Sequence, residues 1–324
     1  MIEDIITQSD SFKKISSEIA SGRLSHAILL ISQDGEYLKA FATLIAKAVL
    51  CPNFSITGHS NCTVCDNIAK GVHPDIHLFG VSNVINADDT SKIINEIYLR
   101  PYSADKKVYI LADYDNIGEV AENKLLKTIE EPPQDTIFIL LAKNTNKLLQ
   151  TTLSRTQKFY LSSFTVQELT EILKSRSVKS PEYVAALANG NLEIALKIGA
   201  EDDAAKMCKF AVDTLCNMNQ TYDVLGYATK MEKFGKDLTF LIDYFLMLVR
   251  DVMCYKSGAK DIITNKVIES DIKQIATQYS YLALTSIVDA GLLASKMLEA
   301  NVSKQNVIDQ FLLKVLEVKL KCKR

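Results

Sequence analysis

Short apolar runs and segments of helical periodicity alternate through the first 160 residues of the chain. The apolar runs, such as Ala27-Ile-Leu-Leu-Ile31, lack polar alternation, which is expected of strands buried on both faces. This alternation predicts an α/β domain in which helices cover both faces of a parallel sheet. We expect strands over 27–31, 75–79, 107–111, 136–142 and 158–161, and helices over 40–50, 90–99 and 121–131.

After residue 162 only helical signals remain. Thr165-Val-Gln-Glu168 is a capping box that opens a helix through residue 175. Two more helices are expected on either side of an Asn189-Gly190-Asn191 turn, over 181–187 and 192–198. From 202 to 323 the chain is amphipathic helix, interrupted near Gly258 and 278–281, which predicts a bundle. We therefore predict three domains, over 1–162, 163–203 and 204–324.

Composition narrows the possible functions. Of the 324 residues, 48% are hydrophobic and 23% charged, as in a globular protein. A net charge of −2 argues against a protein that binds nucleic acid by its own electrostatic field. The N-terminus is acidic without an apolar core, and no uninterrupted apolar run approaches 18 residues, so we expect neither secretion nor membrane spanning. A cytoplasmic location is expected.

The helix over 121–131 carries the most specific motif, Ala121-Glu-Asn-Lys-Leu-Leu-Lys-Thr-Ile-Glu-Glu-Pro-Pro133, and Leu153-Ser-Arg-Thr156 follows the next strand. The order strand, helix, strand and loop with arginine resembles the AAA+ subunits of bacterial DNA polymerase III clamp loaders. Their pattern is close to A-x-N-x-L-L-K-x-L-E-E-P-P followed by S-R-C. The resemblance covers roughly the first 200 residues. It implies a P-loop-type parallel-sheet domain, a small helical lid, an all-α collar for oligomerisation and a role in DNA replication.

The loop after the first strand departs from the phosphate-binding pattern G-x-x-x-x-G-K-[ST]. Only the optional middle glycine, Gly35, is present, and Asp34 and Glu36 place carboxylates where phosphates would lie, which is electrostatically unfavourable. Shifting the alignment by one residue would place a lysine at the lysine position but would restore no glycine pair. We therefore expect neither binding nor hydrolysis of ATP. The residues at the four motif positions are Ser32, Tyr37, Leu38 and Lys39.

Two further positions depart from the family in the same direction. Active subunits follow their third strand with Asp-Glu, whereas this chain has Ala112 and Asp113, so the metal-holding carboxylate is missing. The segment 189–196 resembles the sensor-2 segment, but Ile194 stands at its usual arginine position. The alternative is an active, gamma/tau-like ATPase with unusual loops.

Ser154-Arg155 matches the S-R-C motif, with Thr156 in place of cysteine. In the family this arginine reaches into the nucleotide site of the next subunit in the ring, as an arginine finger supplied in trans. Loss of the chain's own ATP site together with a retained finger is the pattern of delta-prime subunits. The alternative is that Arg155 is an ordinary surface residue.

Four possible metal ligands, Cys51, His59, Cys62 and Cys65, lie within fifteen residues. Thiolate and imidazole ligands suit tetrahedral Zn²⁺, and four protein ligands would make the site structural. The family carries a zinc module here, normally with four cysteines, and a tail that this chain also ends in His73-Pro-Asp75. Alternatively, the module is degraded, His59 is a loop residue and the thiols are free.

The resemblance implies gamma/tau and delta as partner subunits, with the sliding clamp and primed DNA reached through the assembled complex. The chain would then be a component of a DNA polymerase holoenzyme without intrinsic ATPase activity. A second alternative is a freestanding zinc-containing DNA-binding protein, which the net charge of −2 argues against.

Overall fold

The computed structural model describes residues 1–324 except 55–61, 82, 201–203, 236–237, 266–267 and 323–324. It contains two compact units. The first comprises Met1–Phe164 and the short segment Asn191–Ile194, and the second comprises Thr165–Gly190 and Ala195–Arg324. Each unit is described by itself.

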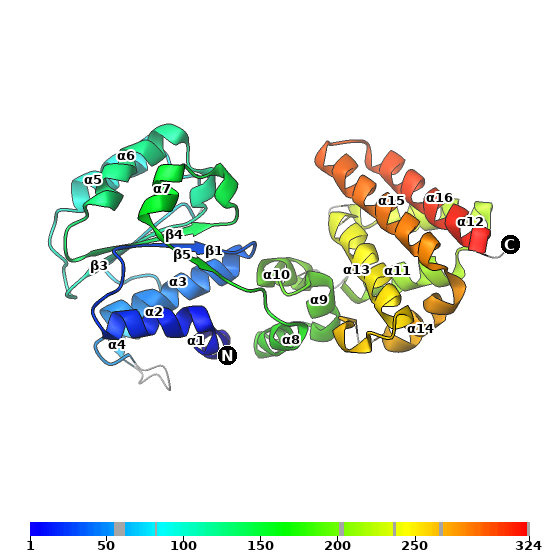
Figure 1. Ribbon diagram of the computed structural model, residues 1–324, viewed down its shortest axis with the longest axis horizontal. Coiled ribbons are helices and arrows are strands. Elements are labelled where there is room, and N and C mark those ends of the chain that lie inside the picture. Colours follow the sequence, from blue (N-terminus) through cyan, green and yellow to red (C-terminus); the bar gives the residue numbers. More distant parts are fainter. Residues whose placement is uncertain (55–61, 82, 201–203, 236–237, 266–267, 323–324) are drawn as a thin grey trace. The chain divides into compact units, whose positions relative to one another are not determined.

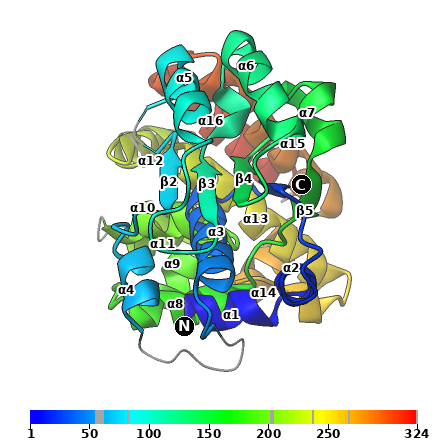
Figure 2. The same cartoon turned by 90° about the vertical axis from the view of Figure 1, so that its left-hand side faces the viewer.

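The first unit is built on a five-stranded sheet, as the alternating pattern predicts. Its strand order is β2-β3-β4-β1-β5, and every pairing is parallel (Figure 2). Three strands have the predicted bounds, and two are displaced at their ends by one residue. The α/β prediction with a parallel sheet is therefore confirmed. The strands are β1 (Ala27–Ile31), β2 (Ile76–Phe79), β3 (Lys107–Leu111), β4 (Thr136–Ala142) and β5 (Gln157–Tyr160).

Helices cover both faces of this sheet (Figure 1). On one side lie α1 (Ile2–Gln8), α2 (Asp10–Ala20), α3 (Gly35–Leu50) and α4 (Thr63–Ala69), and on the other lie α5 (Ala87–Glu96), α6 (Glu119–Glu130) and α7 (Gln150–Arg155). All residues of β1, β3 and β4 are buried, which explains their continuous apolar sequence. Sequence analysis assigned no helix to residues 1–26, and it began α3 five residues too late.

The second unit contains only helices among its described residues. The Thr165–Glu168 capping box is formed, and Asn189 and Gly190 both have positive φ (47° and 81°), as their turn requires. The division into lid and collar remains a prediction. The helices are α8 (Val166–Ser175), α9 (Pro181–Ala188), α10 (Leu192–Ala200), α11 (Ala204–Asn217), α12 (Thr221–Glu232), α13 (Leu238–Lys256), α14 (Glu269–Gln278), α15 (Tyr281–Glu299) and α16 (Lys304–Cys322).

One helix in the described part of the chain is long and apolar enough to cross a membrane, by length and composition only. It is α15, over Tyr281–Leu298, and 28% of that window is buried within the protein. A single helix of this kind is weak evidence for a membrane, because helices that pack against protein pass the same test.

A buried carboxylate, Asp75, organises the loop before β3. It accepts hydrogen bonds from the backbone N–H groups of Tyr102, Ser103 (2.8 Å) and Ala104 (2.9 Å), and from the Ser103 hydroxyl (2.8 Å). Burial alone would raise the pKa of Asp75, but these hydrogen bonds hold it below its usual range. The loop therefore depends on one charged group.

We predict that Asp75→Asn lowers the free energy of unfolding by roughly 1.5–3 kcal/mol at pH 7, because an amide cannot accept all four hydrogen bonds. Since the pKa of Asp75 is lower in the folded protein, its stabilisation is present above the unfolded pKa of about 3.9 and is lost as the pH falls through the folded value. Urea unfolding should show the difference from wild type narrowing below about pH 4. Asp105→Asn, at an exposed position of the same loop, is the control; an equal effect there would contradict the prediction.

Candidate functional site

The loop after β1 is closed by a carboxylate that caps two helices. Asp34 is the N-cap of α3 and accepts from the backbone N–H of Tyr37 (3.0 Å). It also accepts from the backbone N–H groups of Leu192 and Glu193 (3.2 Å) at the start of α10. Burial raises the pKa of Asp34, and the three backbone hydrogen bonds oppose that rise. The loop and residues 191–194 thus form one hydrogen-bonded structure.

A second carboxylate lies directly at the N-terminus of α3. One oxygen of Glu193, Oε2, accepts from the Gly35 N–H (3.1 Å) and pairs with Lys143 Nζ (2.8 Å). A Cβ atom at position 35 would lie 2.9 Å from this oxygen, so the one glycine left in the loop permits the contact. The first N–H groups of a helix attract anions, and in this chain the anion is its own side chain.

The space beside this carboxylate is small. A cavity of about 170 Å³ is lined by residues that include Gly35, Lys39, Asp113, Lys143 and Glu193. Pockets for ordinary small-molecule ligands measure about 300–1,000 Å³. The cavity is therefore smaller than the space that a nucleoside triphosphate occupies.

The remaining positions of the loop are used for packing. Leu38, at the lysine position, is buried, and Lys39 pairs with Glu36 on the next turn back (3.1 Å). Tyr37 packs against Phe164, with ring centroids 4.4 Å apart. Sequence analysis identified all these departures, but it did not identify Glu193. The available signal was a carboxylate beside Ile194 in the sensor-2-like segment.

The carboxylates after β3 are held by local contacts. Asp113 has a left-handed backbone (φ 52°) and accepts from the side-chain amide of Asn116 (3.0 Å). Asp115, which is buried, accepts from the backbone N–H groups of Lys143 (3.1 Å) and Asn144 (3.0 Å). Asp115 thereby fixes the turn that carries Lys143.

Arg155 ends a short helix that is fastened to α6. The buried carboxylate of Glu122 accepts from the Leu149 N–H (3.2 Å) and the Thr152 hydroxyl (2.6 Å), and so holds the start of α7. Thr156, also buried, donates its hydroxyl to the Thr152 carbonyl (3.0 Å). The expectation that Arg155 lies in a loop is wrong: it is the last residue of α7, because these contacts stabilise one helical turn and a half before β5.

The Arg155 guanidinium lies at the surface. Its Nε donates to the carboxylate of Glu130, in the Glu-Glu-Pro-Pro motif, and its Nη1 donates to the Thr151 carbonyl (3.0 Å). Ser154 donates its hydroxyl to the same carbonyl (2.9 Å). The Arg155 side chain is 35% exposed. It can therefore offer N–H groups to an anion outside the chain, since a guanidinium has five donors in a planar fork.

Three of the four predicted metal ligands lie together. Cys51 ends α3, Cys62 is the N-cap of α4, and Cys65 lies in the first turn of α4. Their sulfur atoms all lie within 4.8 Å of one another, and those of Cys51 and Cys62 are 3.3 Å apart. A hydrogen bond from the Cys65 N–H lowers the pKa of the Cys62 thiol, whereas burial raises that of Cys65.

This donor set fits a metal ion. Sulfur atoms around one tetrahedral Zn²⁺ lie about 3.8 Å apart, given a Zn–S bond of about 2.3 Å. The three thiols could hold such an ion between the ends of α3 and α4. His59, the fourth predicted ligand, lies outside the described residues. His73 has another role, because its Nδ1 accepts from the Asp75 N–H (3.2 Å) at the start of β2.

Solved structures similar to this chain include a DNA polymerase III gamma-subunit-related protein from Thermotoga maritima. It is 16% identical, covers 96% of this chain and 100% of its own, and gives a TM-score of 0.49. The Bacillus subtilis DNA clamp loader delta protein is 14% identical over 94% of this chain and 99% of its own, with a TM-score of 0.37.

Sequence comparisons identify the family. Residues 7–165 match the family model described as DNA polymerase III, delta subunit. The chain is 28% identical to subunit delta' of Bacillus subtilis DNA polymerase III, over 94% of this chain and 95% of the relative. It is 25% identical to subunit tau of the same organism, over 89% of this chain but only 56% of that relative. The chain belongs to the AAA+ clamp-loader subunits of DNA polymerase III, a family that serves DNA replication.

Proposed function

We propose that this chain is a delta-prime-type subunit of the DNA polymerase III clamp loader, without ATPase activity of its own. It would assemble with gamma/tau and delta in the cytoplasm and help to place the sliding clamp on primed DNA. The observation that carries the proposal is the Glu193 carboxylate at the N-terminus of α3, together with an outward-facing Arg155. Similarity to subunit delta' along nearly the full length of both chains supports it.

Glu193 explains how the loop is stable without a nucleotide. Its carboxylate accepts the N–H that a phosphate would use, and it neutralises Lys143 through the 2.8 Å ion pair. An incoming triphosphate would meet like charge from both Glu193 and Asp34, with no lysine at the motif position. ATP binding would therefore require these internal hydrogen bonds to break.

We expect the isolated chain to show no saturable binding of Mg-ATP up to about 1 mM in isothermal titration calorimetry. A gamma/tau subunit measured in the same buffer is the positive control. Saturable binding tighter than about 100 µM would instead support the gamma/tau-like alternative.

Arg155 would act on the neighbouring gamma/tau subunit. During ATP hydrolysis negative charge shifts among the oxygens around the transferring phosphoryl group, and a guanidinium aimed there stabilises the transition state. Glu122 and Thr156 position the helix that carries Arg155. The ion pair with Glu130 does not prevent this role, since a pair at this exposure contributes only about 0.2–1 kcal/mol and can be exchanged for a phosphate.

In a loader reconstituted from gamma/tau, delta and this chain, we expect Arg155→Ala to leave assembly intact. Turnover at the one site that loses its finger should fall by about 10³-fold or more, so that the total clamp- and DNA-stimulated ATPase rate falls by that site's share.

Lys158→Ala, which removes an exposed cation from neighbouring β5, is the matched control and should leave the rate unchanged. If the wild-type chain does not assemble, the subunit assignment is wrong. If the Arg155→Ala loader assembles and turns over normally, Arg155 is only a surface residue.

We also propose that Cys51, Cys62 and Cys65, with His59, hold one structural Zn²⁺. The ion would cross-link the end of α3 to the start of α4, and four protein ligands would leave no open position for catalysis. Deprotonation of the thiols would accompany binding.

Elemental analysis of the purified chain should find about one zinc per molecule. Cys62→Ser should abolish retention of the ion and lower the melting temperature, because the cross-link is lost. Cys254→Ser, outside the cluster, should retain zinc. Absence of zinc from the wild-type chain after expression with added zinc would contradict the site and indicate free thiols.

A further inference from the structure

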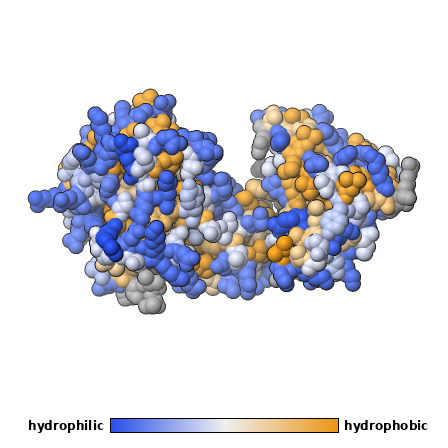
Figure 3. Space-filling model, in the orientation of Figure 1, coloured by the Kyte–Doolittle hydropathy of each residue, from blue (hydrophilic) through white to orange (hydrophobic). Residues whose placement is uncertain are grey.

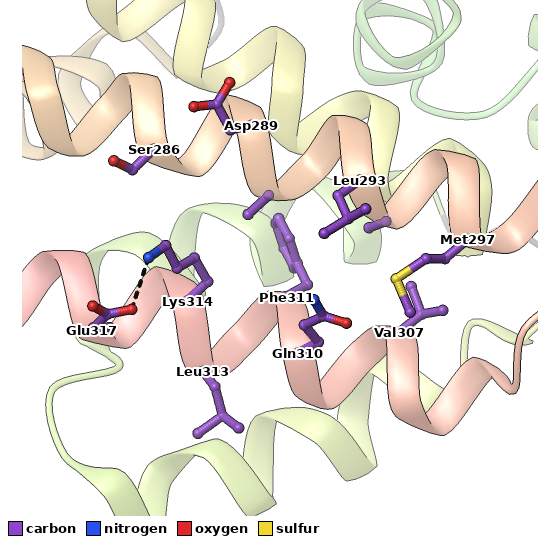
Figure 4. Close-up of a pocket in the computed structure, with 12 residues that line it drawn as sticks. Ser286, Asp289, Leu293, Met297, Val307, Gln310, Phe311, Leu313, Lys314 and Glu317 are labelled. Carbon is purple, nitrogen blue, oxygen red and sulfur yellow. Dashed lines mark hydrogen bonds and ion pairs between the residues drawn. The ribbon is translucent and has the colours of Figure 1, made fainter.

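The last two long helices leave a groove on the surface of the second unit. The groove lies between α15 and α16 and has a volume of about 760 Å³ (Figure 4). Its floor is formed by small or fully buried side chains, Ala294, Val307 and Phe311, while Leu293 and Leu313 stand half-exposed at its edges. Two large apolar side chains therefore face solvent beside a recess that they do not fill.

The groove has the dimensions of a helix-binding site. On α15 it runs from Ser286 through Ala290 to Met297, which is about 16 Å at 1.5 Å per residue, or three helical turns. Ser286, Ala290 and Ala294 follow one another at intervals of four residues, so they share one face of α15. Their small size lets another backbone approach closely.

The surface of α15 is more apolar than a solvated helix requires. The window that is apolar enough for a membrane is only 28% buried, and Figure 3 shows apolar residues gathered over this helix. Leu282, Leu292 and Leu293 are all exposed. Contiguous exposed apolar surface of this kind is typical of an interaction site.

The charges in the groove favour a protein partner over a lipid one. Asp289 is exposed at the centre of the apolar window, where a carboxylate would be costly in a membrane. Figure 4 shows Asp289, Lys314 and Glu317 at one end of the groove and Leu293, Met297 and Val307 at the other. Lys314 is paired with Glu317 (2.9 Å), whereas Asp289 has no ion-pair partner among the described side chains.

We propose that the α15–α16 groove binds an amphipathic helix of a neighbouring clamp-loader subunit. Apolar residues of that helix at intervals of three and four would fill the end near Met297, and a lysine or arginine two turns away would pair with Asp289. This inference rests on the proposed function, since it assigns the contact to a subunit of the same complex.

The test compares two leucines of the same helix. Leu293→Lys changes the groove edge, while Leu282→Lys changes an exposed leucine that does not line the groove. Each full-length variant is titrated against gamma/tau and delta in sedimentation velocity. We expect Leu293→Lys to weaken assembly at least about tenfold and Leu282→Lys to leave it unchanged. Both positions are exposed, so both variants should keep the wild-type melting temperature.

A charge reversal tests the polar end separately. Asp289→Lys should weaken assembly most at low salt, because it replaces attraction by repulsion for a basic partner residue. Normal assembly of both Asp289→Lys and Leu293→Lys would overturn the groove assignment while leaving the proposed function in place. Failure of the wild-type chain to assemble would instead overturn the proposed function.

Two other occupants would also be revealed. If the chain alone forms a dimer that Leu293→Lys dissociates, the groove binds a second copy and not a different subunit. If the wild-type chain binds phosphatidylcholine vesicles and Leu293→Lys does not, the surface is a lipid contact. Equal losses in Leu293→Lys and Leu282→Lys would place the contact on the outer side of α15.

Discussion

The first N–H groups of α3 impose the constraint on which the α/β unit depends. They end the helix that follows β1, and unpaired N–H groups at this depth would be costly. Two carboxylates of the chain satisfy them: Asp34 from the loop itself and Glu193 from a segment more than 150 residues away. Because these partners belong to the protein, the loop has a complete hydrogen-bonded structure without a nucleotide.

The same device recurs at the other loops of the unit. Asp75, Asp115 and Glu122 are all buried, and each accepts hydrogen bonds from a loop or helix end far from it in sequence. A carboxylate can accept several N–H groups at once, so one charged residue can satisfy a loop that has no ladder partner. Burial of these groups is therefore a consequence of parallel strands, whose connections leave many N–H groups unpaired at the sheet edge.

With the centre of the site filled, the groups able to act on other molecules lie at the surface. Arg155 is anchored by Glu122 through α7 but presents its guanidinium outward, and the groove beside α15 presents unfilled apolar surface. A member of this family with such groups contributes to a reaction by what it offers to neighbouring subunits. The thiols of Cys51, Cys62 and Cys65, in contrast, face one another and are suited to a structural ion.

The sequence by itself determined the five strands, because their burial on both faces leaves uninterrupted apolar runs, and β1, β3 and β4 have the predicted bounds. It also determined which chemical groups the phosphate loop lacks, since missing glycines and a missing lysine are visible without coordinates. Only the tertiary structure showed what replaces them, because the contacts from Glu193 to Gly35 and Lys143 join residues with no periodic relation in sequence. The placement of Arg155 on a helix was likewise decided by a distant residue, Glu122, whose burial no local pattern indicates.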